Sequence, residues 1–306
     1  MGINLLASTL EQGLAYGLLA LGVYLTFRIL DFPDLTVEGS FPLGAAVAAK
    51  LIISGANPFI ATFFAFFAGV IAGIITGLIN TKLKIAGLLA GILTMTSLYS
   101  INLRIMGKSN IPLLRNNTII SIFKNWVNIH YTTLISFLII VLIIKLLVDY
   151  FLYTEIGFAV RATGDNPVMI RSLGVNTDLI KILGLSIANG LVALSGALVA
   201  QYQGFTDIGM GMGMIIVGLA SVIIGEVVIR TSRIPLATLG VILGSVIYRL
   251  AISFALQLGF APTDLKIVTA LLVIFALGAP SLRKLMIQDE FADRLLEEGD
   301  SDVESK

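Results

Sequence analysis

Acidic and hydroxyl side chains gather just before the second long apolar run of the chain: Asp31, Asp34, Thr36, Glu38 and Ser40. Carboxylates at such a position could bind a cation, exchange a proton or line a polar path. Pro33 and Pro42 interrupt the same stretch. Irregular backbone at membrane depth is stable only where protein or water satisfies it. We therefore predict a broken helix that lines a translocation path, and a plain loop at the membrane interface is the alternative.

Two polar residues inside apolar runs, Thr94 and Asn189, are assigned to the same predicted path. Small polar side chains in spanning helices also form hydrogen bonds between helices. The sequence does not separate these two roles.

Enzymatic chemistry is not supported by the sequence. Gly107-Lys108-Ser109 resembles the end of a phosphate-binding loop, but Asn102 stands where that loop needs a glycine. The chain has no cysteine and one histidine, His130, so we predict no metal site. We expect no catalytic residue and no cofactor in this chain, and any ATP hydrolysis must occur in another one.

The polar segment 153–181 lies between two membrane-length apolar runs and carries strong helix punctuation. Asp165 or Asn166 could cap a short helix, Pro167 suits its first turn and Gly174 its end. Asn176 or Thr177 could cap the helix that follows. The short helix would show Val168, Met169, Ile170 and Leu173 with no local core to bury them, which is typical of a docking element.

The spacing of Gly157, Arg161, Ala162 and Gly164, followed by Leu173-Gly174-Val175-Asn176, resembles the coupling loop of the branched-chain amino acid, ribose and nucleoside permeases. These are permeases of ATP-binding-cassette importers. The resemblance implies that an ATPase subunit contacts the following residues: Gly157, Arg161, Ala162, Gly164, Asp165, Asn166, Pro167, Val168, Met169, Ile170, Arg171, Leu173, Gly174, Val175 and Asn176.

Composition places the chain in the integral membrane class. Hydrophobic residues make up 57% and charged residues 13%, with a mean hydropathy of +0.97. The net charge of +1 gives no reason to expect nucleic acid as a partner. The fold class is therefore an all-α polytopic bundle with about eight to ten spanning helices, some of them short or broken. The resemblance implies the fold of cobalamin-type importers, with about ten helices and about six of them before the coupling loop.

We predict the spans from long apolar runs, which we expect to carry no charged side chains. They are 5–27, 40–56, 57–81, 85–103, 128–152, 182–206, 208–229, 234–257 and 266–282. We assign 1–284 to the membrane domain. Residues 285–306 are expected to form an acidic cytoplasmic tail, amphipathic and then disordered.

The positive-inside rule fits a cytoplasmic coupling loop, because this orientation also places Lys82, Lys84, Arg230 and Arg233 inside. One basic segment breaks the rule. Arg104, Lys108, Arg115 and Lys124 fall outside with no acidic residue among them. Either the helix count is wrong by one, or these charges dock an extracytoplasmic binding protein.

Glu226 and Arg230 are spaced for an ion pair within a helix, and we expect that pair. An inner gate at Glu226 is the alternative. The run Gly209-Met210-Gly211-Met212-Gly213-Met214 suits either close helix packing or a gate.

The resemblance implies a permease that works in the cell membrane as a dimer, either of two such subunits or with one partner permease. It also implies two cytoplasmic ATPase subunits, which bind ATP and Mg²⁺, and an extracytoplasmic substrate-binding protein. The acidic departures at Asp31, Asp34 and Glu38 resemble a subgroup for amino acid uptake, aromatic amino acids among them. The rival interpretation is a secondary transporter that couples Asp31, Asp34 or Glu38 to protons or sodium.

Overall fold

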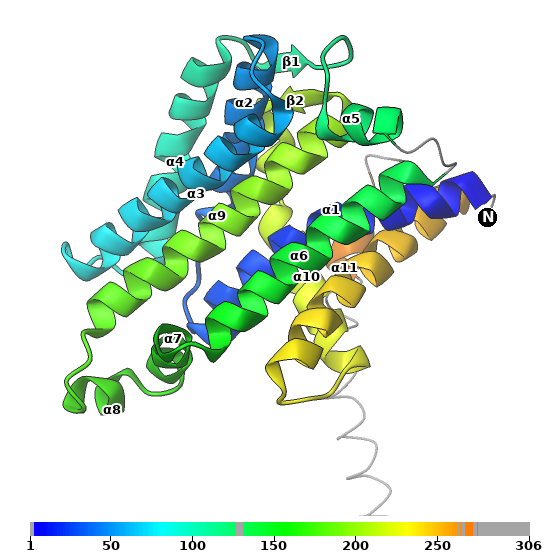
Figure 1. Ribbon diagram of the computed structural model, residues 1–306. Helices are drawn as coiled ribbons and strands as arrows, with labels where there is room; N and C mark the ends of the chain where they lie inside the picture. The colour runs from blue at the N-terminus through cyan, green and yellow to red at the C-terminus, as the bar shows by residue number, and fades with distance from the viewer. Residues whose placement is uncertain (1–2, 127–130, 262–263, 265–266, 272–273, 275–306) are drawn as a thin grey trace, which may run out of the picture.

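The computed structural model describes residues 3–126, 131–261, 264, 267–271 and 274 (Figure 1). Its described part is built almost entirely of helices. The long helices are α1 Ile3–Val23, α2 Val37–Ile53, α3 Pro58–Thr81, α4 Gly87–Met106, α6 Thr132–Tyr153, α9 Thr177–Gln203, α10 Met214–Val228 and α11 Ile234–Gln257. Shorter helices are η1 Tyr24–Ile29, α5 Ile119–Trp126, α7 Glu155–Asp165, α8 Pro167–Ser172 and η2 Ile208–Gly211.

Helix α9 lies at the centre of the bundle, between α3 and α2 on one side and α1 on the other (Figure 1). Its most apolar window is 83% buried, against 28% for the least buried span, α4. Small residues allow this position. A Cβ atom at Gly44, Gly69 or Gly73 would overlap backbone atoms of α9. Close backbone approach of this kind is the usual way in which membrane helices pack.

Two spans are broken. α1 continues through η1 into the non-helical segment 30–36, and only then does α2 begin at Val37. The second broken span is that of α10, which is preceded by η2 and by a left-handed Gly213 with φ of 81°. The predicted broken helices are therefore confirmed, and the glycine and methionine run is the place of the second break.

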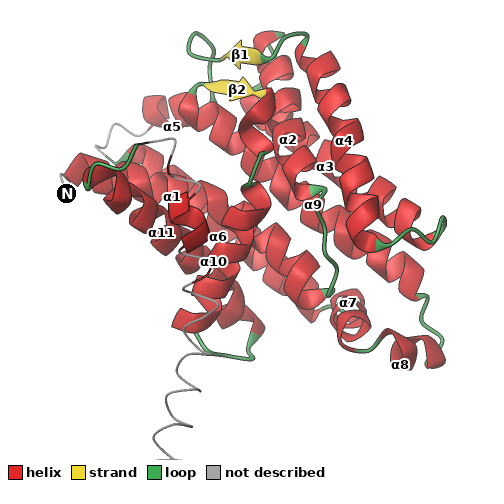
Figure 2. Ribbon diagram, turned by 180° about the vertical axis from the view of Figure 1, so that it is seen from behind, coloured by secondary structure: helices red, strands yellow, loops and turns green. Residues whose placement is uncertain are grey.

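The two ends of the bundle differ, as Figures 1 and 2 show. At one end the short strands β1 Asn110–Pro112 and β2 Phe205–Asp207 pair antiparallel, with Ile111 opposite Thr206. We call this the strand end. At the other end lie α7 and α8, together with the turn between α10 and α11. We call this the loop end.

The predicted spans match the described helices with two corrections. α9 begins at Thr177, before the predicted run 182–206, and Asn176, one of the two expected caps, is its N-cap. Only α1, α2, α3, α4 and α6 are long helices before α7 among the described residues, so the sixth expected there is missing; α5 has 8 residues. The last predicted run, 266–282, and the acidic tail, 285–306, lie largely or wholly outside the described residues.

The spans are also not free of charge. α6 contains Lys145 and Asp149, both buried, whose side chains form an ion pair of 2.5 Å. Asp149 also accepts a hydrogen bond of 2.6 Å from the Thr238 hydroxyl on α11. Burial of a charge in a membrane is tolerated when the charge is paired in this way.

The packing of α3 on α9 gives a stability prediction. Substituting Gly73→Ala should lower the melting temperature of the purified chain, because the new Cβ would overlap the Leu185 carbonyl group. Overpacking typically costs about 1–3 kcal/mol. Gly184→Ala on α9 is the matched control, since its nearest neighbour is a Leu30 methyl group at 3.2 Å, which can move. Equal melting temperatures for both variants in detergent would contradict this packing.

Candidate coupling surface and translocation path

The loop end begins with α7, which turns sharply away from α6. The Thr154 hydroxyl caps α7 by accepting a hydrogen bond of 3.2 Å from the Gly157 backbone N–H. A Cβ at Gly157 would overlap the Phe151 carbonyl oxygen. Gly164 lies equally close to the Ile29 carbonyl oxygen at the end of η1. Both glycines of the motif therefore allow close backbone contacts, which no larger residue permits.

Helix α8 is short but firmly capped. The Asn166 side chain accepts a hydrogen bond of 3.0 Å from the Met169 N–H, and Pro167 occupies the first turn. The helix ends at Ser172, and the left-handed Gly174, with φ of 86°, follows its C-cap Leu173. The sequence left the cap open between Asp165 and Asn166, and the structure places Asn166 there.

The apolar side chains of α8 divide into two groups. Val168, Met169 and Leu173 are 77%, 52% and 69% exposed. Ile170 is only 4% exposed, so its predicted place on the exposed surface is wrong. Ile170 lies one position after Met169 and two after Val168, and side chains at such spacings point to different faces of a helix. Val168, Met169 and Leu173 form what we call the coupling surface.

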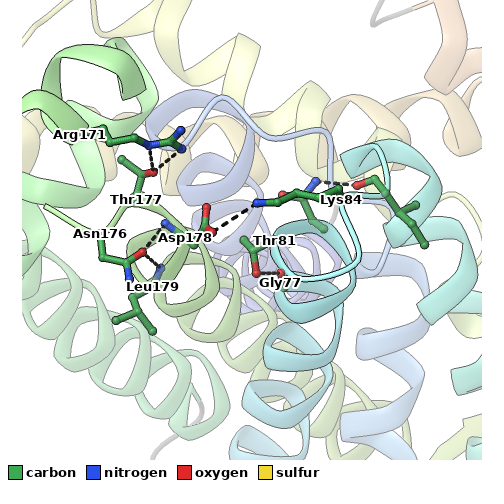
Figure 3. Close-up of polar contacts among 10 residues, drawn as sticks. Gly77, Thr81, Lys84, Arg171, Asn176, Thr177, Asp178 and Leu179 are labelled. Carbon is green, nitrogen blue, oxygen red and sulfur yellow. Dashed lines mark hydrogen bonds and ion pairs between the residues drawn. The ribbon is translucent and has the colours of Figure 1, made fainter.

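Polar contacts hold the coupling surface to the bundle (Figure 3). The Arg171 guanidinium donates to the Thr177 hydroxyl at 2.9 Å, and Asn176 caps α9 by accepting from the Asp178 and Leu179 N–H groups. Lys84, from the loop between α3 and α4, lies 3.5 Å from the Asp178 carboxylate. α8 is therefore anchored at its own C-terminus and through the start of α9.

A polar cavity of 640 Å³ lies behind α7 at the loop end. Arg161 and Asp165 of α7 line it together with Arg28 and Glu226. Glu226 forms an ion pair of 2.6 Å with Arg28 on η1. The expected pair with Arg230 is therefore wrong: Arg28 is held beside Glu226 by the break in α1, which sequence spacing does not reveal. Arg230 lines the same cavity.

The predicted path residues come together only in part. Asn189 of α9 donates 2.7 Å to the Asp34 carboxylate and accepts 2.7 Å from the Ser40 hydroxyl. Asp34 also accepts from the Thr36 N–H at 2.9 Å. All four side chains are buried, and we call them the polar network. The Thr36 hydroxyl extends the network to Thr76 of α3 at 2.8 Å.

The other predicted path residues lie elsewhere. Asp31 is exposed and takes a positive φ of 50° just after η1. Thr94 is buried and donates to the Ala90 carbonyl of its own helix at 3.0 Å. Glu38 lines a separate cavity beside α4 and η2. The translocation role of these residues stays a prediction, and what the structure adds is that the carboxylates do not form one site.

The basic residues Arg104, Lys108, Arg115 and Lys124 are all exposed on the segment that contains β1 and α5. This segment lies at the strand end, opposite to α7 and α8 (Figures 1 and 2). Its place agrees with an external position if the coupling surface is cytoplasmic.

Four polar side chains with structural consequences were not found from sequence: Asn102, Thr76, Lys145 and Asp149. The spacing of Lys145 and Asp149, four residues apart in an apolar run, could have revealed the pair. Arg249 of α11 was also missed; its guanidinium carbon lies 3.7 Å from the centre of the Tyr16 ring.

Together, the helical bundle with its seven membrane-length helices among the described residues and the anchored coupling surface define a multi-pass membrane permease. Such a permease needs a partner to supply energy. The chain belongs to the family described as "Branched-chain amino acid transport system / permease component", whose pattern matches residues 5–277. It is thus the permease of an ATP-binding-cassette importer in the plasma membrane and not an enzyme. Membership in this family implies, in general, ATPase and substrate-binding partners.

Two relatives cover nearly the whole chain. The tyrosine transport system permease protein of Clostridioides difficile is 46% identical over 90% of this chain and 91% of its own length. An uncharacterized protein of Rickettsia prowazekii is 38% identical over 90% of this chain and 98% of its own length. The autoinducer 2 import system permease protein of Salmonella paratyphi B is 33% identical, over 28% of this chain and 25% of its own. No solved structure matches the chain significantly.

The buried Lys145–Asp149 ion pair of α6, whose carboxylate also accepts from Thr238 of α11, gives a second prediction. Asp149→Ala leaves the Lys145 ammonium buried without its carboxylate, which typically costs about 3–5 kcal/mol. The folded yield in detergent, measured by size-exclusion chromatography, should fall strongly. The double variant Lys145→Leu with Asp149→Leu should recover most of that yield, because apolar replacement removes both charges together. Equal losses in the single and double variants would contradict a pair held by mutual charge.

Proposed function

We propose that this chain is the permease of an importer for amino acids, with aromatic amino acids such as tyrosine as the preferred substrates. Membership in the permease family supports the transport of small polar solutes. The 46% identity to a tyrosine permease over nearly the full length of both chains supports the substrate. A secondary transporter, in contrast, gives no reason for an exposed and anchored α8.

The coupling surface carries the mechanistic part of the proposal. Three apolar side chains project from a short helix that is capped at its start and tied to α9 at its end. A groove on a cytoplasmic ATPase would bury them. When ATP closes the two ATPases, the displacement of α8 passes to α7 and then to η1, because Gly164 contacts the Ile29 backbone. Coupling needs such an unbroken series of contacts.

Two copies of the permease form the working unit in this proposal. α4 is the least buried span and exposes Thr96, Ser97, Tyr99 and Ser100 along one face. The Thr96 and Ser97 hydroxyls donate to carbonyl groups of α4 itself. A second permease or a water-filled path between the copies would supply further polar contacts, which lipid chains cannot. The substrate would pass along this face.

Charge on the coupling surface should uncouple the importer. In Met169→Asp or Leu173→Asp, a carboxylate would be buried in the ATPase groove, which costs several kcal/mol unless it is paired. Substrate uptake should be abolished and co-purification of the ATPase lost, while membrane insertion stays normal. Ser172→Asp is the matched control on α8, because Ser172 is exposed and polar. Unchanged co-purification with both aspartate variants would disprove docking at α8.

The basic segment at the strand end should receive the binding protein. Reversal of Arg104, Lys108 and Arg115 to glutamate should slow uptake most at low binding-protein concentration, because opposed charges act mainly on the association rate. The effect should weaken with salt, since screening sets in beyond about 8 Å at physiological ionic strength.

The side of the membrane can be tested independently, because the chain has no cysteine. Ser109→Cys and Asn117→Cys should react with an impermeant thiol reagent on intact cells. Reaction only after the membrane is broken would place the segment inside and remove this docking proposal.

A further inference from the structure

A second cavity, of 260 Å³, lies between α2, α4 and η2 towards the strand end. Its polar lining consists of Glu38, Thr96, Tyr99 and Asn102, and most of the rest is apolar, with Met95 and Met212 among it. The volume is close to the lower limit of small-molecule sites. It therefore suits a ligand of about the size of one amino acid.

Asn102 marks the deep wall of the cavity. The residue is fully buried, and its Nδ2 donates to the Gly39 carbonyl oxygen at 3.1 Å, which fixes the orientation of the amide. Its Oδ1 has no hydrogen-bond partner among the described residues. An unsatisfied buried acceptor destabilises the folded protein. A ligand that donates a hydrogen bond would remove that destabilisation.

Glu38 supplies a negative charge to the same cavity. Its Oε1 accepts a hydrogen bond of 3.0 Å from the Gly213 N–H, which holds the carboxylate beside the segment that precedes α10. A carboxylate and an amide oxygen both accept hydrogen bonds. A primary ammonium has three N–H donors, so it could donate to the unpartnered Asn102 Oδ1 and place its positive charge beside the Glu38 carboxylate.

The apolar part of the cavity sets the shape of the rest of the ligand. Met95 and Met212 carry flexible, polarisable side chains whose sulfur atoms make favourable contacts with aromatic rings. Tyr99 adds a ring of its own. A small hydrophilic solute would leave these surfaces unused, whereas an aromatic side chain would bury against them.

We propose that this cavity is the binding subsite of the permease for an aromatic amino acid, with the substrate ammonium between Glu38 and Asn102 and the ring against Met95, Met212 and Tyr99. This proposal rests on the proposed function and gives it a site. The cavity adjoins the exposed face of α4, so it opens onto the predicted path.

Protection of a single cysteine tests the subsite in the assembled permease–ATPase complex in proteoliposomes. M212C places the only permease thiol at the cavity, provided that a cysteine-free ATPase is used. L-tyrosine should slow its reaction with a maleimide, and 3-(4-hydroxyphenyl)propionate, which lacks the ammonium, should not. L114C is the control thiol, since Leu114 is exposed at the strand end and does not line the cavity.

Two variants in the M212C background show whether the named acceptors are responsible. E38Q keeps the size of the side chain but removes the charge, and it should raise the half-protecting concentration of L-tyrosine by about tenfold. N102L should raise it by about fivefold. E11Q, which removes a carboxylate outside the cavity, should leave it unchanged. Binding of the ATPase to each variant shows that it is folded.

Equal protection by L-tyrosine and its deaminated analogue would overturn the subsite, as would an unchanged half-protecting concentration in both E38Q and N102L. If the unmodified importer still takes up tyrosine in an ATP-dependent way, the proposed function survives that result. Absence of ATP-dependent uptake of aromatic amino acids by the unmodified importer would overturn both proposals.

Discussion

The hydrogen bonds between Asn189 and the segment around Asp34 are the interaction on which the rest of the structure depends. Non-helical backbone within a membrane must find its partners inside the protein. Here the Asp34 carboxylate accepts from the Thr36 N–H, and Asn189 of the central helix accepts from Ser40 and donates to Asp34. The break between η1 and α2 is thereby fixed against α9. It determines the position of Glu38 on one side and of Arg28 on the other.

Contacts through this break join the two ends of the molecule. At the loop end, η1 touches α7 at Gly164 and pairs with Glu226 near the end of α10. Towards the strand end, the N–H of Gly213, the residue that precedes α10, donates to Glu38. α10 is thus held near both ends: its Glu226 pairs with Arg28 of η1, and the Gly213 N–H that precedes it donates to Glu38 of α2. A displacement of α7 therefore has a continuous route to the cavity that contains Glu38. The exposed Arg28–Glu226 pair is weak and can separate at small cost, as a moving contact requires.

Much of the fold could be predicted from sequence because its signals are local. Asn166, Pro167 and Gly174 predicted the bounds of α8. The glycine and methionine run before α10 was interpreted as a site of close packing or a gate, and the break there was not predicted. The contacts of Glu226 could not be predicted, because its partner Arg28 lies far away in sequence and reaches it only through η1. The inward position of Ile170 was missed since all apolar residues of α8 were treated as one exposed group. Asn102 was missed for another reason: an unsatisfied acceptor exists only in three dimensions, after every neighbour has been placed.

Cross-linking from the coupling surface tests the central claim most directly, namely that a separate ATPase drives this permease through α8. A photoreactive maleimide attached to Val168→Cys would report what lies on the exposed apolar side of that helix in the membrane-embedded complex. Since the native chain lacks cysteine, the label has one position. We expect a cross-link to the ATPase from Val168→Cys and none from Leu114→Cys at the strand end. A cross-link from Leu114→Cys with none from Val168→Cys would contradict the assignment of the coupling surface.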